Sequence, residues 1–185
     1  GAVDVSARRR RIDPVTRELF KHATAALVDE MAVAIARTAR STNLKNSMDL
    51  SAALCDPQGR LIAQGLTLPL HLGSVPGAMQ AFLARFGHEL RPGDVYALND
   101  PYNGGTHLPD IYVAQPVFAA RRLVGHVVTI AHHTDIGGKT AGGTIDLGRQ
   151  VGFLGCRVDR RSYDSICVLR NGRAAVGTRQ RPVEV

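Results

Sequence analysis

The chain has 185 residues, 44% of them hydrophobic, so it can bury the core of one domain or slightly more. It contains no apolar run of the roughly 18–20 residues that a membrane helix needs, and its charged start GAVDVSARRRR lacks the apolar segment of a secretory signal. The net charge of +7 comes largely from residues 8–11 and an arginine-rich stretch after Ala141. Because aromatic residues make up only 5% of the chain and zinc-finger spacings are absent, we interpret this charge as solvated ends, with no nucleic acid and no membrane as partners.

The first predicted element is a long helix from Asp13 to about Arg40. Asp13 is a good N-cap, and Pro14 fits the first helical position. Apolar residues then recur at helical spacing, at Val15, Leu19, Ala23, Ala26, Leu27, Met31, Ala34 and Ile35. This stripe predicts a helix that packs on a sheet.

Hairpin strands and a second helix are predicted next. Strands 50–55 and 60–64 flank a type I turn at residues 56–59. A helix is expected from Ser74, as its N-cap, to the residue before Gly87, followed by a strand over 94–98. Two further strands, 111–117 and 123–130, are joined by a short Ala-Ala-Arg-Arg turn. Without repeated strand–helix–strand units, this order predicts an α+β fold, in which the long N-terminal helix packs on mixed or antiparallel hairpin strands.

The composition divides the chain into three regions. Residues 1–12 form a basic N-terminal arm, and residues 13–143 read as a coherent globular domain. Residues 144–185 are a Gly- and Arg-rich tail without comparable periodicity. The cysteines (Cys55, Cys156 and Cys167) are odd in number and lack metal or redox spacing, which favours a reduced, cytoplasmic protein.

Two polar segments, 99–110 and 132–138, carry the candidate chemistry. His107 and Asp110 are three residues apart across a proline, so a turn can aim both inward. His132 ends the second strand of the last hairpin, and because a hairpin brings its two ends together, Asp110 and His132 should be neighbours. We therefore predict a metal site at the strand edges, formed by His107, Asp110 and His132. Mixed nitrogen and oxygen ligands suit Zn, Mn or Fe(II).

Nearby polar residues allow several interpretations, and we take His71, His133 and Asp135 as candidate catalytic residues. His133 and Asp135 could orient the ligands by hydrogen bonds, act as a general base, or belong to a loop network. His71 precedes the expected helix N-terminus, where it could help to bind an anionic group, or it could be a capping or core histidine. His22, His88 and His126 are interpreted as structural histidines, whereas Asp100 could equally be a functional residue or a turn residue.

Several stretches together resemble the hydantoinase B/oxoprolinase family. They are DPVT (13–16), DLSAAL (49–54), HLGSVP (71–76), LRPGDV (90–95), the highly specific motif 99–110, and HHTDIGG (132–138). They occur in the family's order between residue 13 and about residue 143. The family includes subunits of ATP-dependent hydantoinases and lactamases, and the related acetone and acetophenone carboxylases.

The resemblance implies one divalent metal held by Asp49, His107, Asp110 and His132; Asp49 enters only through this likeness. It also implies a hetero-oligomer in which a hydantoinase A-like ATPase subunit uses ATP to phosphorylate the substrate. Consistent with this, the chain has no phosphate-binding P-loop of its own. The implied function is the metal-dependent subunit of an ATP-dependent hydrolase of cyclic amides such as hydantoin, 5-oxoproline or a lactam. The alternatives are a subunit of an ATP-dependent ketone carboxylase and an inactive, truncated metal-binding fragment, because family subunits are far longer.

Overall fold

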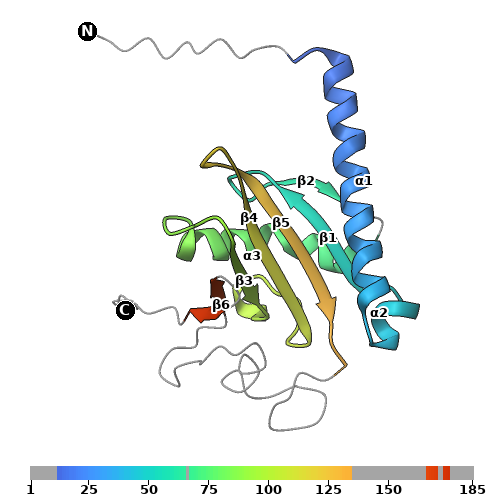
Figure 1. Ribbon diagram of the computed structural model, residues 1–185. Helices are drawn as coiled ribbons and strands as arrows, with labels where there is room; N and C mark the ends of the chain where they lie inside the picture. Colours follow the sequence, from blue (N-terminus) through green and yellow to red (C-terminus); the bar gives the residue numbers. More distant parts are fainter. Residues whose placement is uncertain (1–11, 66, 135–165, 171–172, 176–185) are drawn as a thin grey trace.

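The computed structural model describes residues 12–65, 67–134, 166–170 and 173–175 (Figure 1). The helices are α1 (Pro14–Thr38), α2 (Thr42–Asn46), α3 (Pro69–Phe86) and the short 3₁₀ helix η1 (Pro101–Asn103). The strands are β1 (Leu50–Cys55), β2 (Leu61–Gln64), β3 (Asp94–Leu98), β4 (Asp110–Ala119), β5 (Arg122–His132), β6 (Ile166–Arg170) and β7 (Arg173–Ala175). None of the helices in these ranges is long and apolar enough to cross a membrane.

All of these strands belong to one seven-stranded sheet with the order β2-β1-β5-β4-β3-β6-β7. Every pairing in the sheet is antiparallel. The β4–β5 hairpin lies at its centre and contains the longest strands (Figure 1). The prediction of an α+β protein built on antiparallel hairpin strands is therefore confirmed. β6 and β7 were not predicted, although they lie in the tail region 144–185.

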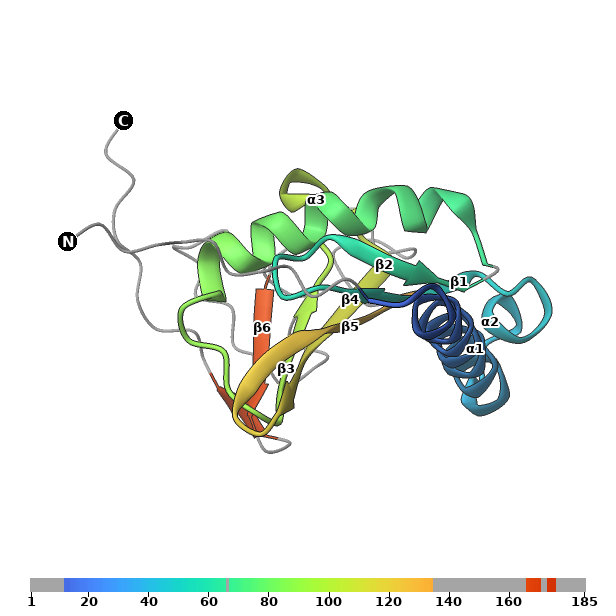
Figure 2. The ribbon, with the colours of Figure 1, turned by 90° about the horizontal axis from the view of Figure 1, so that it is seen from above.

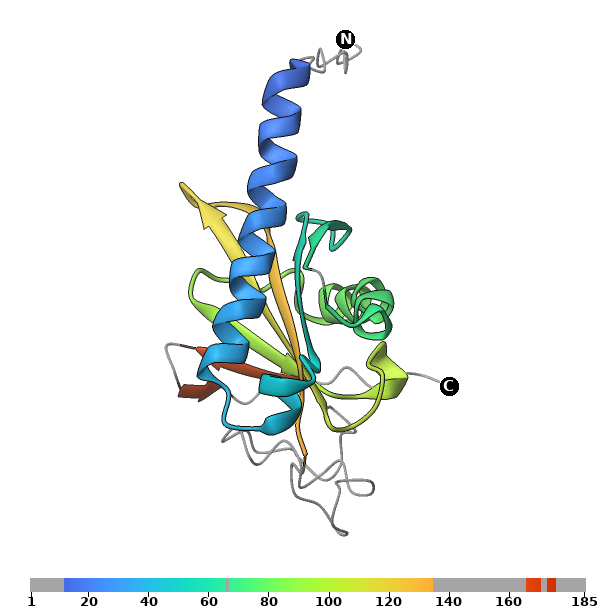
Figure 3. The same cartoon turned by 90° about the vertical axis from the view of Figure 1, so that its right-hand side faces the viewer.

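Helices cover both faces of the sheet, as Figures 2 and 3 show. The alternation of side chains along β1 explains the two cores. Ala53 and Cys55 belong to the larger core beneath α3, where they pack with Met79 and other residues. Leu50 and Ala52 point to the opposite face and pack beneath α1 and α2. The molecule is thus a three-layer arrangement in which β1 contributes to both interfaces.

α1 packs on the sheet only through its C-terminal half. Val28 and Ala32 are its buried residues, whereas Val15 and Leu19 are 68% and 66% exposed. Figures 1 and 3 show the first turns of the helix projecting past the ends of the strands. The interpretation of the whole apolar stripe as a sheet-packing face is therefore wrong for the residues before Val28.

α3 begins five residues before the predicted cap. It starts at Pro69, and Leu68 at the N-cap position makes no side-chain capping bond. Ser74 instead lies inside the helix, where its hydroxyl donates to the His71 carbonyl at 2.6 Å. The prediction failed because Pro76 follows closely and proline is normally tolerated only in the first turn, whereas here it lies within the helix. The predicted end before Gly87 is confirmed.

Candidate metal centre

The base of the β4–β5 hairpin brings Asp110 and His132 together. Asp110 is the first residue of β4, His132 is the last residue of β5, and the two are directly paired in the sheet. Alternate strand residues share a face, and Tyr112, two residues after Asp110, lies in the core under α3. The Asp110 and His132 side chains therefore lie on the α3 face. The predicted proximity of these two residues is confirmed.

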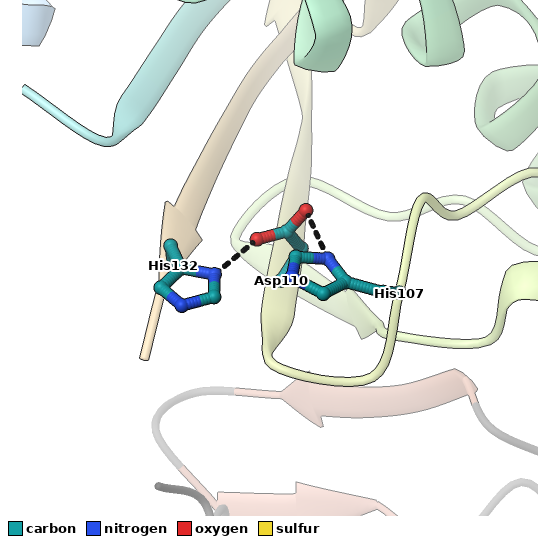
Figure 4. A group of neighbouring side chains, drawn as sticks. All are labelled: His107, Asp110 and His132. Atoms are coloured by element: carbon teal, nitrogen blue, oxygen red, sulfur yellow. Dashed lines mark hydrogen bonds and ion pairs between the residues drawn. The ribbon is translucent and has the colours of Figure 1, made fainter. Parts of the chain in front are cut away.

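Asp110 lies between two imidazole rings, as Figure 4 shows. His107 Nδ1 lies 2.8 Å from Asp110 Oδ2, and His132 Nδ1 lies 3.0 Å from Asp110 Oδ1. The two rings are stacked, with their centroids 4.9 Å apart. One ligand atom from each of the three residues lies within 4.8 Å of the others, so the group could hold a metal ion. Imidazole nitrogen with carboxylate oxygen is a donor set suited to zinc or a transition metal.

The loop that carries His107 is held closely against α3. Asp100 caps η1 by accepting the Tyr102 N–H at 2.9 Å, which confirms that Asp100 has a turn role. Gly104 follows with a φ of 89°, in the left-handed region. A Cβ at Gly104 would lie only 2.4 Å from the backbone of α3 at Gly77, so only glycine allows this approach. The close contact of Gly104 with α3 therefore fixes the position of the loop three residues before His107.

His71 reaches the site from the first turn of α3. Its ring is 2% exposed, and its Nε2 lies 3.2 Å from Asp110 Oδ2 and 3.7 Å from Asp49 Oδ1. Nδ1 has no hydrogen-bond partner among the described residues. The expectation that His71 precedes a helix N-terminus is wrong, because α3 already begins at Pro69. The structure agrees with the alternative of a core histidine, in contact with the carboxylates of the site.

Asp49 lies beside the group but outside it. Its backbone carbonyl accepts the His132 N–H at 3.1 Å, which fixes the start of β1 against the end of β5. Its side chain is 26% exposed and approaches the cluster through His71. Among the residues that the structure describes, the group whose ligand atoms are close enough to share one cation is His107, Asp110 and His132, without Asp49.

The charge of Asp110 explains why a cation fits this place. Burial raises the pKa of its carboxyl group, but hydrogen bonds from His71, Thr106 and His132, together with the charge of His71, outweigh burial and hold the pKa well below its usual range. Asp110 is fully buried, and a buried negative charge requires a nearby positive group or hydrogen-bond donors. Protonated histidines or a metal ion can both supply the positive charge. The donor set and the charge therefore fit a divalent metal.

Thr106 is a member of the site that the sequence did not reveal. Its hydroxyl donates to Asp110 Oδ2, and its backbone N–H donates to the Tyr112 hydroxyl at 3.1 Å. Tyr112 in turn lies 2.5 Å from the Ser74 hydroxyl on α3. In the sequence, the only indication of its role is a hydroxyl side chain directly before the candidate ligand His107. These contacts link β4, the loop and α3 around the carboxylate.

His133 and Asp135 follow the end of β5. The His133 N–H donates to the Pro109 carbonyl at 2.9 Å, which closes the base of the hairpin. Burial, helped by the charge of His132, lowers the pKa of the His133 ring, and Asp110 partly offsets this. A neutral ring can accept a proton near neutral pH. Asp135 lies outside the described residues.

The histidines interpreted as structural lie away from the site. His126 is 1% exposed in the middle of β5, edge-on to Phe82 with centroids 5.7 Å apart. His88 is exposed after α3, and His22 is exposed on α1. The interpretation of His126 as a core residue is therefore confirmed.

Comparison with known proteins identifies the family. The family described as hydantoinase B/oxoprolinase matches residues 13–152, and the chain belongs to this family. The match extends nine residues beyond residue 143, to which the motifs of the family resemblance reach.

Characterised relatives are much longer than this chain. It is 41% identical over 128 residues to the 5-oxoprolinase of Saccharomyces cerevisiae, covering 69% of this chain and 10% of that protein. It is 34% identical over 147 residues to the 5-oxoprolinase of Dictyostelium discoideum, covering 80% of this chain and 12% of that protein. It is 35% identical over 147 residues to the caprolactamase subunit beta of Pseudomonas jessenii, covering 80% of this chain and 25% of that subunit. The chain thus spans between a tenth and a quarter of these relatives.

Solved structures show the same fold. The ATP-dependent caprolactamase from Pseudomonas jessenii aligns with a TM-score of 0.64 and 32% identity, over 74% of this chain and 26% of that one. The nucleotide-free acetone carboxylase aligns with a TM-score of 0.65 over 70% of this chain and 17% of that one. Its identity is 20%, so this second likeness concerns the fold alone.

Proposed function

We propose that this chain is the metal-dependent part of an ATP-dependent cyclic-amide hydrolase that acts on a substrate phosphorylated by a partner subunit. The main support is the group formed by His107, Asp110 and His132, which could hold a metal ion. The relatives include 5-oxoprolinases and a caprolactamase subunit, and 5-oxoproline and caprolactam are both cyclic amides. We therefore expect a substrate with a lactam or related cyclic-amide group.

The proposed centre holds one divalent metal, Zn, Mn or Fe, through Asp49, His107, Asp110 and His132. Asp49 is included because its backbone bonds to His132 and its carboxylate lies 3.7 Å from His71. A divalent cation bound there would supply positive charge that stabilises negative charge developing on a substrate oxygen. The residues around it would hold the ligands in place and move protons.

Three further residues complete the proposed centre. His71 contacts the carboxylates of both Asp49 and Asp110 from α3, so it would fix their orientation. His133, whose pKa is lowered by burial, would accept a proton from the attacking water. Asp135, two residues later in the sequence, is proposed to act with His133.

ATP is expected to act through a hydantoinase A-like ATPase subunit in a hetero-oligomer. Amide resonance makes a lactam carbonyl carbon a poor electrophile, and phosphorylating its oxygen creates a good leaving group. The sequence of this chain has no P-loop with which to bind ATP itself. We propose that residues 13–143 carry the metal-binding domain, with residues 1–12 as a basic arm, and that the tail region 144–185 adds β6 and β7 to the same sheet. A cytoplasmic location is proposed from the cysteine pattern.

The carboxylase branch is the second candidate, favoured by the fold shared with acetone carboxylase. In that case turnover with the ATPase subunit would depend on bicarbonate, and a ketone would replace the cyclic amide. An inactive metal-binding fragment is the third candidate, and it would keep the group formed by His107, Asp110 and His132. Such a fragment would bind metal but would not turn over either substrate.

Substitution of His107 tests the metal centre. After loading with Zn²⁺ or Mn²⁺ and desalting, we expect about one metal per chain by elemental mass spectrometry. His107→Ala should weaken metal affinity by about 100-fold, because one ring nitrogen of the donor set is lost. His88→Ala is the matched control, since His88 is 68% exposed and lies outside the group. A full metal complement in His107→Ala would contradict the proposal.

A further inference from the structure

Three hydroxyl groups form a chain of contacts from α3 to the carboxylate of the candidate centre. The Ser74 hydroxyl lies 2.5 Å from the Tyr112 hydroxyl, which lies 3.2 Å from Thr106 Oγ1. Thr106 in turn donates its hydroxyl hydrogen to Asp110 Oδ2. We call Ser74, Tyr112 and Thr106 the hydroxyl chain. Its members come from α3, from β4 and from the loop before β4, so it connects three parts of the fold.

The hydrogen bonds of the hydroxyl chain have a single direction. Each hydroxyl has one hydrogen, and an ionised Asp110 carboxylate has none, so Thr106 must be the donor to Asp110. Thr106 Oγ1 then accepts from Tyr112, which leaves Ser74 as the donor to Tyr112. Ser74 also donates to the His71 carbonyl at 2.6 Å, so its hydrogen is shared between two acceptors. Every bond from Ser74 onward therefore points toward the Asp110 carboxylate.

Tyr112 holds Thr106 by two atoms. Besides the contact with Oγ1, the Tyr112 oxygen accepts the backbone N–H of Thr106 at 3.1 Å. The Tyr112 side chain is 2% exposed and lines a small apolar cavity under α3. Apolar surroundings offer its hydroxyl no other partner, and a buried tyrosine hydroxyl needs one. The Tyr112 hydroxyl therefore fixes both the backbone and the side chain of Thr106.

The hydroxyl chain also supports the beginning of α3. Pro76 has no N–H, so the helix lacks one backbone bond between its first turns and the rest. Leu68 at the N-cap position makes no side-chain capping bond either. The backbone of α3 therefore holds its first turns less firmly than those of an uninterrupted helix. The contact between Ser74 and Tyr112 ties this part of α3 to β4.

Asp110 Oδ2 is held from two directions. Thr106 approaches it from the loop, and His71 Nε2 approaches it from α3 at 3.2 Å. Ser74 lies one turn after His71, so Ser74 and Tyr112 connect the two donors and close a ring of contacts. A rotation of the carboxylate would break at least one of these contacts. The protein itself therefore sets the orientation of Asp110.

We propose that Tyr112 is a positioning residue of the metal centre. Through Thr106 it orients the Asp110 carboxylate between the two imidazole rings. The oxygens of this carboxylate lie 2.8 Å from His107 Nδ1 and 3.0 Å from His132 Nδ1. Hydrogen bonds that orient ligands in this way affect metal affinity about as strongly as they are conserved in their geometry, typically by about 10–100-fold. The inference rests on the proposed metal centre and adds to it a residue two positions from a ligand.

Zn²⁺ titration calorimetry of Tyr112→Phe tests the role of the hydroxyl. The change removes one oxygen and leaves the ring in the core. We expect Zn²⁺ affinity to fall by about 10–100-fold. Tyr96→Phe is the matched control, because Tyr96 is also 2% exposed and lines the same cavity, but its hydroxyl contacts Asp94 at 3.3 Å. Its affinity should stay within about 2-fold of the wild type.

The visible absorption spectrum of bound Co²⁺ separates positioning from a general loss of stability. The absorption depends on the number and geometry of the ligands around the ion. Tyr112→Phe should shift this spectrum at saturating Co²⁺, whereas Tyr96→Phe should leave it unchanged. Thermal unfolding of both metal-free variants measures how far each change affects the fold.

Thr106 provides a second and independent test. Thr106→Val removes the hydroxyl at nearly constant volume and should also weaken Zn²⁺ binding by about 10–100-fold. Thr106→Ser should restore most of this affinity, because it keeps the hydroxyl. Since Tyr112 acts through Thr106, Tyr112→Phe combined with Thr106→Val should lose less than the product of the two separate losses.

The outcomes distinguish this inference from the proposed function. A wild-type chain that binds neither Zn²⁺ nor Co²⁺ would contradict the metal centre and the inference together. Normal affinity and an unchanged Co²⁺ spectrum in Tyr112→Phe would overturn the inference alone and leave the centre in place. Fully multiplicative losses in the double variant would likewise overturn it, because Tyr112 would then not act through Thr106.

Discussion

Asp110 organises the candidate centre through contacts with residues from several elements. His107, Asp110 and His132 could be predicted because their proximity depends only on a short turn and one hairpin. The contact from His71 could not, since it depends on how α3 packs over the end of the sheet. The contact from Thr106 depends on the path of the loop before β4, which its sequence does not specify. Asp49 came from family resemblance alone. Its position one residue before β1 is adjacent to His132 only because β1 pairs with β5, which are far apart in the sequence.

His126 makes the stability of the protein sensitive to mild acid. The ring is 1% exposed, so its charged form would lose almost all of its hydration. Burial lowers its pKa below the ordinary 6.5, and the Pro57 carbonyl and Asp56 only partly offset this. The unfolded chain therefore binds a proton at a higher pH than the folded one. The resulting contribution to stability is fully present above pH 6.5 and is lost as the pH falls below it.

We expect the free energy of unfolding to fall between pH 7.5 and pH 5.5, by at most about 1.4 kcal/mol per pH unit from this group. His126→Leu should lose less stability over the same interval, because the titrating ring is gone. Guanidinium titrations of the metal-free chain at both pH values measure this, with the exposed His88→Leu as the control. An identical pH dependence in His126→Leu and the wild type would show that another group is responsible.

At the scale of elements, predictions from local signals were more reliable than predictions that depend on how elements pack together. The ends of the central hairpin and the C-terminal end of α3 follow from turn residues, and they match the structure to within a few residues. The start of α3 was missed because Pro76 lies inside a helix that tertiary contacts hold together. The apolar stripe of α1 was recognised, but a periodic pattern does not reveal how far the neighbouring sheet extends.

The contact between η1 and α3 should be intolerant of any side chain. In Gly104→Ala the added Cβ would meet the backbone of Gly77 and Ala78 at 2.4 Å, at a φ of 89°. We expect a loss of stability of about 1–3 kcal/mol, with weaker metal binding because the His107 loop must move. Thermal unfolding and metal titration measure the two effects.

Gly73→Ala is the matched control for Gly104→Ala. Gly73 lies in α3, and a Cβ there would meet nothing within 4 Å. This change should be neutral or should stabilise the helix by about 0.5–1 kcal/mol, because glycine is unfavourable in a helix interior. Equal stability of the two variants would mean that the loop adapts to the Gly104 change without cost.

At the scale of the whole molecule, the sheet is larger than the sequence suggested. β6 pairs with β3, and β7 pairs with β6; both come from a region where glycine and arginine obscure any alternation. Strand pairing over such a separation depends on the edge that β3 offers, which local patterns cannot show. The pairing of β1 with β5, which brings Asp49 to the candidate centre, could not be predicted from local patterns either.

The proposed metal should stabilise the whole fold, since its ligands come from the start of β1, the β3–β4 loop and both strands of the central hairpin. Free metal at 100 times its dissociation constant should add about 2.7 kcal/mol to the free energy of unfolding. The thermal midpoint should therefore rise with Zn²⁺ or Mn²⁺ and fall again with a chelator. Scanning calorimetry checks this, and an equal rise in His107→Ala would place the binding site elsewhere.

The β4–β5 hairpin separates its two ends by a long distance. Ala120 and Arg121 form its two-residue tip, both with positive φ, as a type I′ turn requires. The tip lies nine residue pairs from the Asp110–His132 base, which corresponds to about 30 Å of strand. A fluorophore or affinity handle attached there would follow the protein through purification and titration without touching the ligands, while a change of length at the base would displace them.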